Sequence, residues 1–587
     1  MKVLFRFKTR KGALKNKIKE RLTGYTGEDF VKGIMIYAVA AFLICFMVLP
    51  LGTLFSKAFQ DREGNFAGFS QFAEYFQSET MVYSVGNTFF VAIMSTLVSV
   101  TLAFFFAYSL SRKNVPFKSF FRYIGMIPIF APTMLLGIAL IYLFGNKGIF
   151  TAMGFSIPLY GKTGIIIAES IYCFPVATTL LMVAFSSADN RLYEAAETMG
   201  TSAVRKMFTI TIPNIKYGLI SAVFVSFTYS FTDFGAPSVV GGNYNVLATD
   251  VYKQVVGQQN FNMGAVVGIV LLFPAVLSFA VDRITSRKQN SSISSKAVPY
   301  VIRPHRASDI AATIFCIVIT SAMLLFFFVA FFASVIRLWP YDLTFTLSNY
   351  DLTKAASGEG FQAFKNSVLI SVISAFLGTV VSFVGAYMIE TNRKFQKIRK
   401  ATYFLSVAPL AIPGTVVGLS FIMFFNAGEF SLPFLDGYVI TNPFHGIYGT
   451  IWIIVLANMI HFYSVPFTTA TTALKRLDRE FETVSESLAV PFYKTLRKIT
   501  IPLCLPAIWE MFIYFFVNSL VTVSAVVFLY SPTVKIAAVA IVNMEGAGQT
   551  APAVAMCMLL LFINLLVRLG YEAVNRLLLK KRKRCLS

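Results

Sequence analysis

Charged side chains are scarce in this chain, and their scarcity excludes most soluble folds. Only 13% of the 587 residues are Asp, Glu, Lys or Arg, whereas 56% are hydrophobic. A soluble domain needs more polar surface than this composition supplies. Apolar runs near or above the ~20 residues that a helix needs to cross a bilayer recur along the whole sequence. The composition therefore predicts an integral membrane protein.

Side chains that commonly carry chemistry are also few and dispersed. The six cysteines form no CxxC pair, and five of them lie in or beside apolar segments. The six cysteines are Cys45, Cys173, Cys316, Cys504, Cys557 and Cys585, and the three histidines are His305, His445 and His461. We expect the cysteines to be small core residues, with no disulfide framework and no metal site. Without clustered histidines, paired carboxylates or a nucleophile elbow, nothing in the sequence supports a membrane enzyme.

The net charge of +23 comes from basic residues that fall between the apolar segments. Most of them lie in alternate loops, as the positive-inside rule predicts for a membrane protein. This distribution excludes nucleic acid as the expected partner. The basic run at 580–584 is expected to lie against anionic lipid head groups.

Twelve apolar segments are long enough to be transmembrane helices. We expect them near 34–56, 83–110, 121–145, 164–187, 217–240, 261–283, 309–336, 364–391, 401–426, 447–474, 504–530 and 551–576. The basic loops at 112–122 and 393–400 belong in the cytoplasm, and the acidic loop at 57–79 belongs outside. This alternation predicts that both termini lie in the cytoplasm. We expect the chain to be embedded in the bacterial inner membrane. The first span begins too late, and is too long, for a cleaved signal peptide.

Two similar halves divide the chain. Asn87 and Asn366 match at an offset of 279, and the segments 128–137 and 409–418 match at 281. The segments 189–213 and 478–502 match at 289, so the loop between the third and fourth spans absorbs the difference. Six spans are an even number, so the halves share one orientation, related by an axis along the membrane normal. We therefore expect a pathway on that axis.

Five regions follow from this organisation. We expect a basic cytoplasmic N-terminus at 1–33, a first repeat at 34–283, and a second repeat at 309–576. A Ser- and Lys-rich cytoplasmic linker at 284–308, expected to be flexible, joins the repeats. A basic cytoplasmic tail at 577–587 completes the chain.

The cytoplasmic loop after the fourth span of each half carries an amphipathic pattern. In the first half, Asp189 can cap a helix, and Gly200 is expected to end or bend it. Leu192, Ala195, Ala196, Met199 and Ala203 recur at helical spacing and predict one apolar face. Pro213 marks the return to the membrane. A helix lying on the lipid surface is the alternative interpretation, but it does not explain why both halves keep one length, an Asp start and an Ile-Pro end.

These residues resemble a known family. Glu194-Ala195-Ala196, then Gly200, then Ile212-Pro213, resemble the EAA loop of binding-protein-dependent ABC importer permeases. The resemblance implies an all-α membrane protein of about twelve helices in two parallel six-helix type I permease repeats. It also implies that each loop forms a coupling helix that docks in a groove of an ATPase subunit.

The second copy of the loop departs from the pattern. There Asp478 and Pro502 are kept, but Thr483-Val484-Ser485 replaces Glu-Ala-Ala, and Ala489 replaces the glycine. The apolar face, with Phe481, Val484, Leu488 and Phe492, is retained. We still expect docking there, with Glu486, which aligns with Glu197, as the remaining acidic contact.

The chain has no nucleotide site of its own. The tripeptide at 161–163 reads Gly-Lys-Thr, but a phosphate-binding loop needs a glycine at 156, where the chain has Ser156. ATP and Mg²⁺ are therefore expected on two partner ATPase subunits, with no cofactor on this chain. An extracytoplasmic solute-binding protein is the third expected partner.

The substrate is predicted from resemblance alone. The stretches at 231–268 and 523–548 resemble permeases assigned to 2-aminoethylphosphonate uptake, which is the expected cargo. Ferric ion is the main alternative within the importer class, with polyamine or thiamine behind it. An ion-coupled secondary transporter is the alternative class, although carboxylates and histidines within its spans are few.

Several polar residues lie at membrane depth. Asp233 is either a polar contact on the path, with Thr232 beside it, or a cap where Gly-Ala-Pro breaks the helix. Glu169, Glu510 and Asn518 are expected to make interhelical hydrogen bonds, and Asn518 is also a candidate residue of the path. Prolines at 128 and 132, matched at 409 and 413, should kink the third and ninth spans. Those kinks are either gate hinges or static packing features.

Overall fold

The computed structural model describes residues 27–292, 298–355, 358–392, 394–431, 439–478, 480–488 and 490–586. Two of the sequence-based expectations lie outside these residues. They are the basic N-terminus before residue 27 and the position of Ala489. The side chain of Glu486 and the side chains of the basic tail are likewise outside the described part.

The first half begins and ends with long helices and carries short helices between its spans. Its elements are α2 (Gly27–Leu43), η1 (Ile44–Val48), α3 (Leu49–Ala58), α4 (Ser70–Gln77), α5 (Glu79–Arg112), α6 (Lys118–Gly125), η2 (Ile127–Phe130), α7 (Thr133–Phe144), α8 (Ile149–Ala152), α9 (Lys162–Ser186), α10 (Asn190–Thr198), α11 (Ala203–Lys206), η3 (Met207–Thr211), α12 (Ile212–Thr232), α13 (Gly235–Val240), α14 (Leu247–Tyr252), η4 (Lys253–Gly257) and α15 (Phe261–Ser292).

The second half repeats this plan and adds two small hairpins. Its elements are α16 (Arg306–Ser334), β1 (Ile336–Leu338), β2 (Asp342–Phe345), η5 (Ser348–Tyr350), α17 (Gly360–Thr391), α18 (Gln396–Val407), η7 (Ala408–Ala411), α19 (Gly414–Asn426), β3 (Glu429–Ser431), β4 (Val439–Thr441), η8 (His445–Ile447), α20 (Ile451–His461), α21 (Ser464–Lys475), α22 (Glu480–Ser487), α23 (Phe492–Thr495), η9 (Leu496–Thr500), α24 (Ile501–Val521), α25 (Ala537–Gly546) and α26 (Thr550–Leu586). Strands β1 and β2 pair antiparallel, as do β3 and β4.

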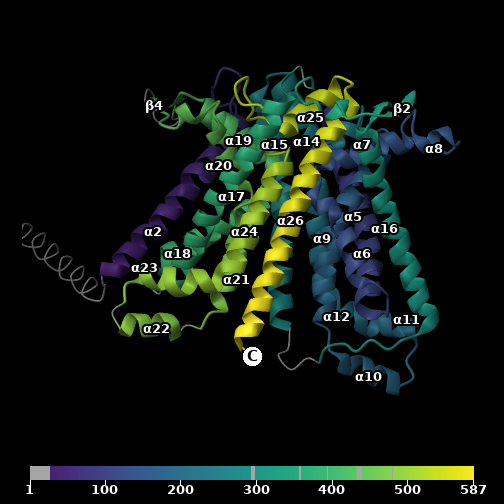
Figure 1. Ribbon diagram of the computed structural model, residues 1–587. Helices are drawn as coiled ribbons and strands as arrows, with labels where there is room; N and C mark the ends of the chain where they lie inside the picture. The colour runs from purple at the N-terminus through teal and green to yellow at the C-terminus, as the bar shows by residue number, and fades with distance from the viewer. Residues whose placement is uncertain are drawn as a thin grey trace, which may run out of the picture.

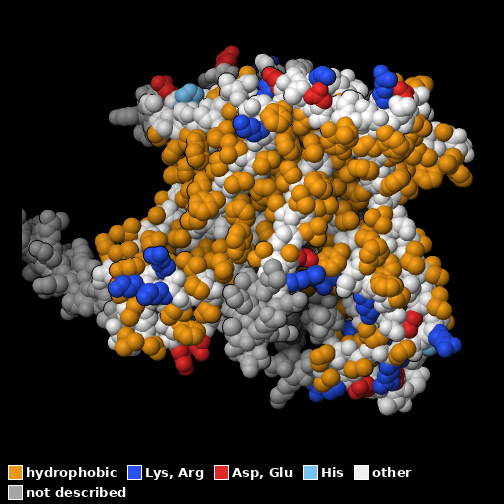
Figure 2. Space-filling model, in the orientation of Figure 1, with side chains coloured by type: hydrophobic (Ala, Val, Ile, Leu, Met, Phe, Trp, Pro, Cys, Tyr) orange, Lys and Arg blue, Asp and Glu red, His pale blue; other side chains and the backbone are white. Residues whose placement is uncertain are grey.

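The predicted all-α membrane fold is confirmed. Among the described residues, ten helices are long and apolar enough to cross a bilayer, or up to twelve if each bent pair counts as one span. Figure 2 shows hydrophobic side chains forming a broad band across the middle of the molecule, with most charged side chains above or below it. Such a band is what a bilayer-spanning surface requires, because lipid tails cannot solvate charge.

The two halves repeat each other element by element. Helix α9 and the pair α20–α21 coincide at the offset of 289, and so do α12 and α24. The π-helical turns η3 and η9, which lead each half back into the membrane, also match at 289. One chain has therefore built the same six-span unit twice.

Prolines break the third and ninth spans, as their positions predicted. In the second half, the helix up to Ala411 and the helix from Gly414 are bent by 111°. Pro132 and Pro413 each precede the helix that follows the break, because proline lacks the N–H that an uninterrupted helix would need. Residues at both breaks line one cavity between the halves.

The first helix of each half packs against helices of the other half. Helix α2 packs against α17 and α18, whereas α16 packs against α5, α6 and α7. At the start of α2, Lys394 Nζ lies 2.7 Å from Asp29 Oδ2. At the start of α16, the Asn114 N–H donates to Asp309 Oδ1 at 3.2 Å. The exchange of first helices ties the two repeats into one body.

Helix α15 extends into the linker expected at 284–308, of which residues 293–297 lie outside the described part of the chain. Helix α15 continues to Ser292 instead of ending at 283, and α16 begins at Arg306. The Lys, Arg and Gln residues past 283 favour helix, so α15 extends beyond the apolar segment. Residues 298–305 run in an extended conformation along the molecule's lower face and contact α10.

Candidate functional site

The two amphipathic loops form short helices on one face of the molecule. Figure 1 shows α10 and α22 below the bundle, on the same side and at opposite edges. Each is followed by a further short helix, α11 or α23, and then by the π-helical turn that leads into the next span. The pair is therefore placed to be reached by partners that approach from a single side.

Helix α10 has well-formed ends. The Asp189 carboxylate accepts the Arg191 N–H at 3.1 Å, as the sequence predicted for a cap. That backbone N–H, together with the Arg191 side chain, holds the pKa of Asp189 below its ordinary value. Gly200 follows the helix with a φ of 64°, in the left-handed region that favours glycine, and so ends it. Pro213 and Pro502 lie in the first turns of α12 and α24, as expected.

The exposed face of the two helices is matched residue for residue. In α10 the side chains of Leu192, Ala195 and Met199 are exposed, and Met199 is 81% exposed. At the offset of 289 they become Phe481, Val484 and Leu488, of which Leu488 is 70% exposed. We call these six residues the docking face. Large apolar side chains this exposed, outside the hydrophobic band, are typical of surfaces that bind another protein or a membrane.

The predicted apolar faces are not continuous, because Ala203 and Phe492 lie on the separate helices α11 and α23. Ala196 is buried beneath α10, together with Asn190 and Tyr193, and its counterpart Ser485 is buried beneath α22. Helical spacing alone grouped Ala196 with Leu192 because the two are four residues apart. The bundle covers the side of α10 that Tyr193 marks, so Ala196 supports the helix and is not part of its exposed surface.

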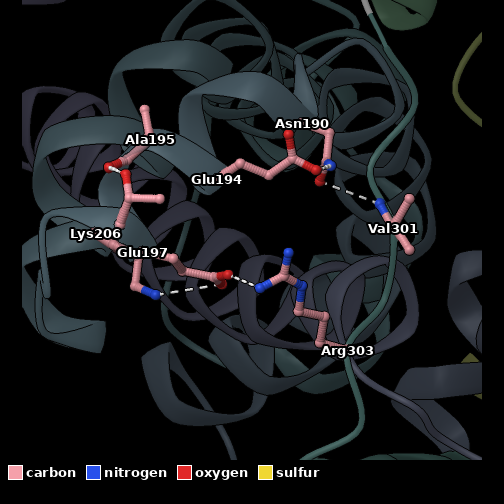
Figure 3. A network of polar contacts seen from close by, with 8 residues as sticks. Asn190, Glu194, Ala195, Glu197, Lys206, Val301 and Arg303 are labelled. Carbon is pink, nitrogen blue, oxygen red and sulfur yellow. Dashed lines mark hydrogen bonds and ion pairs between the residues drawn. The ribbon is translucent and has the colours of Figure 1, made fainter.

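The segment that joins the halves lies directly along α10. The Asn190 N–H donates to the Val298 carbonyl at 2.9 Å, and the Val301 N–H donates to the Asn190 side chain at 3.2 Å. Glu197 forms ion pairs with Arg303 and, at 3.6 Å, with Lys206 (Figure 3). Glu194 accepts the Asn190 amide at 2.8 Å. We call residues 298–303 the strap, because they attach the linker to α10.

An arginine and two tyrosines complete the attachment. The Arg112 guanidinium lies 4.0 Å from the centroid of the Tyr300 ring and 5.1 Å from that of Tyr193. The two rings meet edge to face at 5.0 Å. Arg112 is 4% exposed and donates to the Phe185 carbonyl at 2.9 Å, so it is fixed to the end of α9. No local pattern indicated this cluster, because its members are up to 188 positions apart in the sequence.

Helix α22 and the turn that follows it are held by different contacts from those of α10. The carboxylate of Asp478 accepts the Glu480 N–H at 3.0 Å, and Ser485 bonds the Thr495 hydroxyl. The Phe492 N–H donates to Glu28, from the start of α2, at 3.3 Å. Between α22 and α23 lies a groove of about 670 Å³ whose walls include Phe481, Val484 and Leu488. The N-terminus of α2 thus takes the supporting place that the strap has in the first half.

A cavity of about 150 Å³ lies between the halves. It is lined by matched elements of both repeats, namely the breaks before α7 and α19, the helices α9 and α20, and the ends of α12 and α24. All three residues that the sequence suggested for a path, Thr232, Asp233 and Asn518, line it. Among the described residues, none of those in its lining is Lys or Arg. The cavity has the position expected of a pathway on the pseudo-two-fold axis.

Asp233 caps a helix and also lines the cavity. One carboxylate oxygen accepts the Ala236 N–H at 2.9 Å and so caps α13, and the other accepts the Thr133 hydroxyl at 3.1 Å. The same side chain lines the cavity. A Cβ at Gly235 would lie 2.1 Å from Thr133 Oγ1, so only glycine leaves room for this hydroxyl.

Asn518 differs from expectation, because its side chain bonds the Tyr514 carbonyl of its own helix at 2.7 Å and not a neighbouring helix. Glu169 is buried at 0% exposed. Its carboxyl lies beside that of Asp233, close enough to interact with it. The sequence showed a carboxyl at membrane depth, but not that it faces a second one.

The sequence is similar to those of known transport proteins. The family described as "Binding-protein-dependent transport system inner membrane component" matches residues 99–291 and again 378–580. A ferric transport system permease protein of Actinobacillus pleuropneumoniae is 26% identical over 570 residues, covering 93% of this chain and 78% of its own. A putative ferric transport system permease protein of Haemophilus influenzae is 24% identical, over 87% of this chain and 79% of its own.

A shorter relative matches part of the chain. The molybdenum transport system permease protein of Haemophilus influenzae is 31% identical over 151 residues, covering 25% of this chain and 66% of its own. The double family match, over more than half of the sequence, shows that the chain belongs to the family of binding-protein-dependent transport permeases. It is a double-length permease of an ABC importer, a multi-pass protein of the bacterial inner membrane.

Proposed function

We propose that this chain is the membrane-spanning subunit of an ATP-driven importer whose cargo is ferric ion. An extracytoplasmic binding protein would deliver the ion to the face opposite α10 and α22. Two ATPase subunits, which hold the ATP and Mg²⁺, would dock on those helices, and both termini would lie on that cytoplasmic side. The chain itself would hold no cofactor.

The side chains that line the cavity are the observation that favours ferric ion as the cargo. Its charged side chain is Asp233, surrounded by hydroxyl and phenol groups, and its described lining contains neither Lys nor Arg. An oxyanion such as molybdate or a phosphonate is held most strongly by cationic side chains, which the described lining lacks, and the side-chain N–H donors there are those of Asn518 and His461. Hard oxygen ligands instead suit a hard cation. The relatives above transport ferric ion or molybdenum, so they give no support to 2-aminoethylphosphonate.

The docking face supports the coupling role. Closure of two ATPases on ATP would draw α10 and α22 together, and the π-helical turns would transmit that movement to α12 and α24. Because α12 and α24 line the cavity, their movement would open it alternately to the two sides. The strap and the N-terminus of α2 would keep each coupling helix attached to its span while it is pulled.

Uptake into proteoliposomes tests the proposal. The vesicles would contain this chain with its ATPase and binding-protein partners, and the assay would follow radioactive ferric ion, molybdate and 2-aminoethylphosphonate. We expect ferric uptake that requires internal ATP and continues when ion gradients are collapsed. Uptake of an anion without ferric ion would refute the cargo, and uptake that follows an ion gradient without ATP would refute the coupling.

A further inference from the structure

A basic cavity of about 440 Å³ lies at the end of the first half that carries α10. Its walls are the ends of α5 and α9, the short helix α6, and the strap. Two arginines line it, Arg112 from α5 and Arg122 from α6, together with the hydroxyl-bearing residues Ser111, Thr179 and Ser186. Within the described residues, no Asp or Glu belongs to this lining. The cavity therefore has the charge that suits an anion.

Arg112 is a buried cation whose charge no carboxylate balances. It is 4% exposed, and it forms no ion pair with any residue that the structure describes. The Phe185 carbonyl accepts one of its N–H groups, and the rings of Tyr193 and Tyr300 lie beside the guanidinium. Its Nε has no hydrogen-bond partner in this part of the chain. A buried charge without a counter-charge is costly, and a bound anion would supply one.

Arg122 brings a second positive charge to the same cavity. Its side chain is exposed, and it too forms no ion pair among the described residues. The carboxylate of Glu197, on the neighbouring α10, is already engaged by two other cations. Guanidinium groups bind phosphate oxygens through paired N–H donors, so two of them at one cavity favour a phosphate group as the ligand.

The corresponding place in the second half carries its own counter-charge. At the offset of 279, which aligns the ends of α5 and α17, Ser111 becomes Glu390 and Arg112 becomes a threonine. At the offset of 289, Ser186 becomes Lys475, whose Nζ lies 3.5 Å from Glu390 Oε1. One lysine and one carboxylate thus stand where the first half has two arginines and a serine. The internal repeat provides a matched control for the basic cavity.

We propose that the basic cavity binds a phosphate group through Arg112 and Arg122. This site is separate from the cavity assigned to the cargo and does not depend on the identity of that cargo. Basic cavities between membrane helices on the cytoplasmic side bind the head groups of anionic lipids, and a free phosphate ion offers the same chemistry. Because Pro299 and Tyr300 line the cavity, the bound anion would lie beside the strap that supports α10.

Native mass spectrometry tests the site with a lipid as the probe. The full chain in neutral detergent would receive equal amounts of phosphatidylglycerol and phosphatidylcholine, and the lipids that remain bound would be counted. The wild type should retain one more phosphatidylglycerol than Arg122→Gln. It should also retain one more than Ser111→Glu, which places the carboxylate of the second half in the first. Lys475→Gln lowers the net charge equally and should retain as many as the wild type, because that lysine is already paired.

Calorimetry tests the same site with inorganic phosphate in the same detergent without added lipid. If the ligand is a soluble anion, phosphate should bind saturably to the wild type and about tenfold more weakly to Arg122→Gln, which loses one charged hydrogen-bond donor. Lys475→Gln should bind phosphate as the wild type does.

The two assays identify the source of the phosphate group. Phosphatidylglycerol retention that requires Arg122 supports a lipid head group, and phosphate binding that requires Arg122 supports a free ion. Equal losses in Arg122→Gln and Lys475→Gln would overturn the site, because binding would then follow net charge alone. Failure of both Arg122→Gln and Ser111→Glu to weaken binding in either assay would also overturn it.

Discussion

Replacing Tyr300 by alanine should loosen α10 and leave the stability of α22 unchanged. The ring packs edge to face on Tyr193 and beneath the Arg112 guanidinium at 4.0 Å. An aromatic pair of this kind contributes about 0.5–1.5 kcal/mol, and a cation over a ring contributes about 0.5–2 kcal/mol. Losing both contacts should lower the free energy of local opening of α10 by about 2 kcal/mol, near the middle of the combined range. This corresponds to a roughly 30-fold larger equilibrium constant for that opening.

Hydrogen exchange measures this loosening. Amides in 190–198 should exchange roughly 30-fold faster in Tyr300→Ala, whereas those in 480–487 should be unchanged because α22 is supported by α2. Tyr300→Phe keeps the ring and should resemble the wild type. Arg303→Ala should have a smaller effect, because Arg303 is 64% exposed and a surface ion pair contributes only about 0–1 kcal/mol. Unaltered exchange in α10 of the alanine variant would refute the role assigned to the strap.

Two further predictions concern stability. Asp250, in α14 outside the membrane-spanning helices, is 6% exposed, and burial raises its pKa to about 6. A folded pKa above the unfolded value means that the free energy of unfolding falls as pH rises from about 4 to about 6, by about 3 kcal/mol in all. The melting temperature should therefore drop over that interval in the wild type and change little in Asp250→Asn; parallel curves would contradict this. At the cavity, a Cβ on Gly414 would lie 2.3 Å from Ser524 Oγ, mirroring Gly235 and Thr133, so Gly414→Thr should destabilise the fold by about 1–3 kcal/mol and added Ser524→Gly should restore it. Failure of the second change to rescue would mean that the two halves are not interchangeable at this contact.

Much of the architecture follows from local sequence patterns. Apolar runs set the spans, prolines set the breaks before Thr133 and Gly414, and Asp189 and Gly200 set the ends of α10, since each effect acts within a few residues. The side of a short helix that the bundle covers is a tertiary property, and Ala196 was misplaced for that reason. Contacts over long separations, such as Arg112 with Tyr300, leave no local trace.

The cavity was only partly predictable for a similar physical reason. Thr232, Asp233 and Asn518 drew notice as polar residues within or beside apolar segments, and all three line it. Which helices meet around these residues is a tertiary property, so the sequence alone did not show that the two halves close one cavity between them.

The number of ATPase subunits bound to the purified chain tests the central claim most directly. Met199 and Leu488 occupy matched positions on the docking face, at 81% and 70% exposed. A buried arginine there would be left without a partner in the interface, which is strongly unfavourable. Native mass spectrometry should find two ATPase subunits on the wild-type chain and none on the double variant M199R/L488R. Two subunits retained on that double variant would contradict the account.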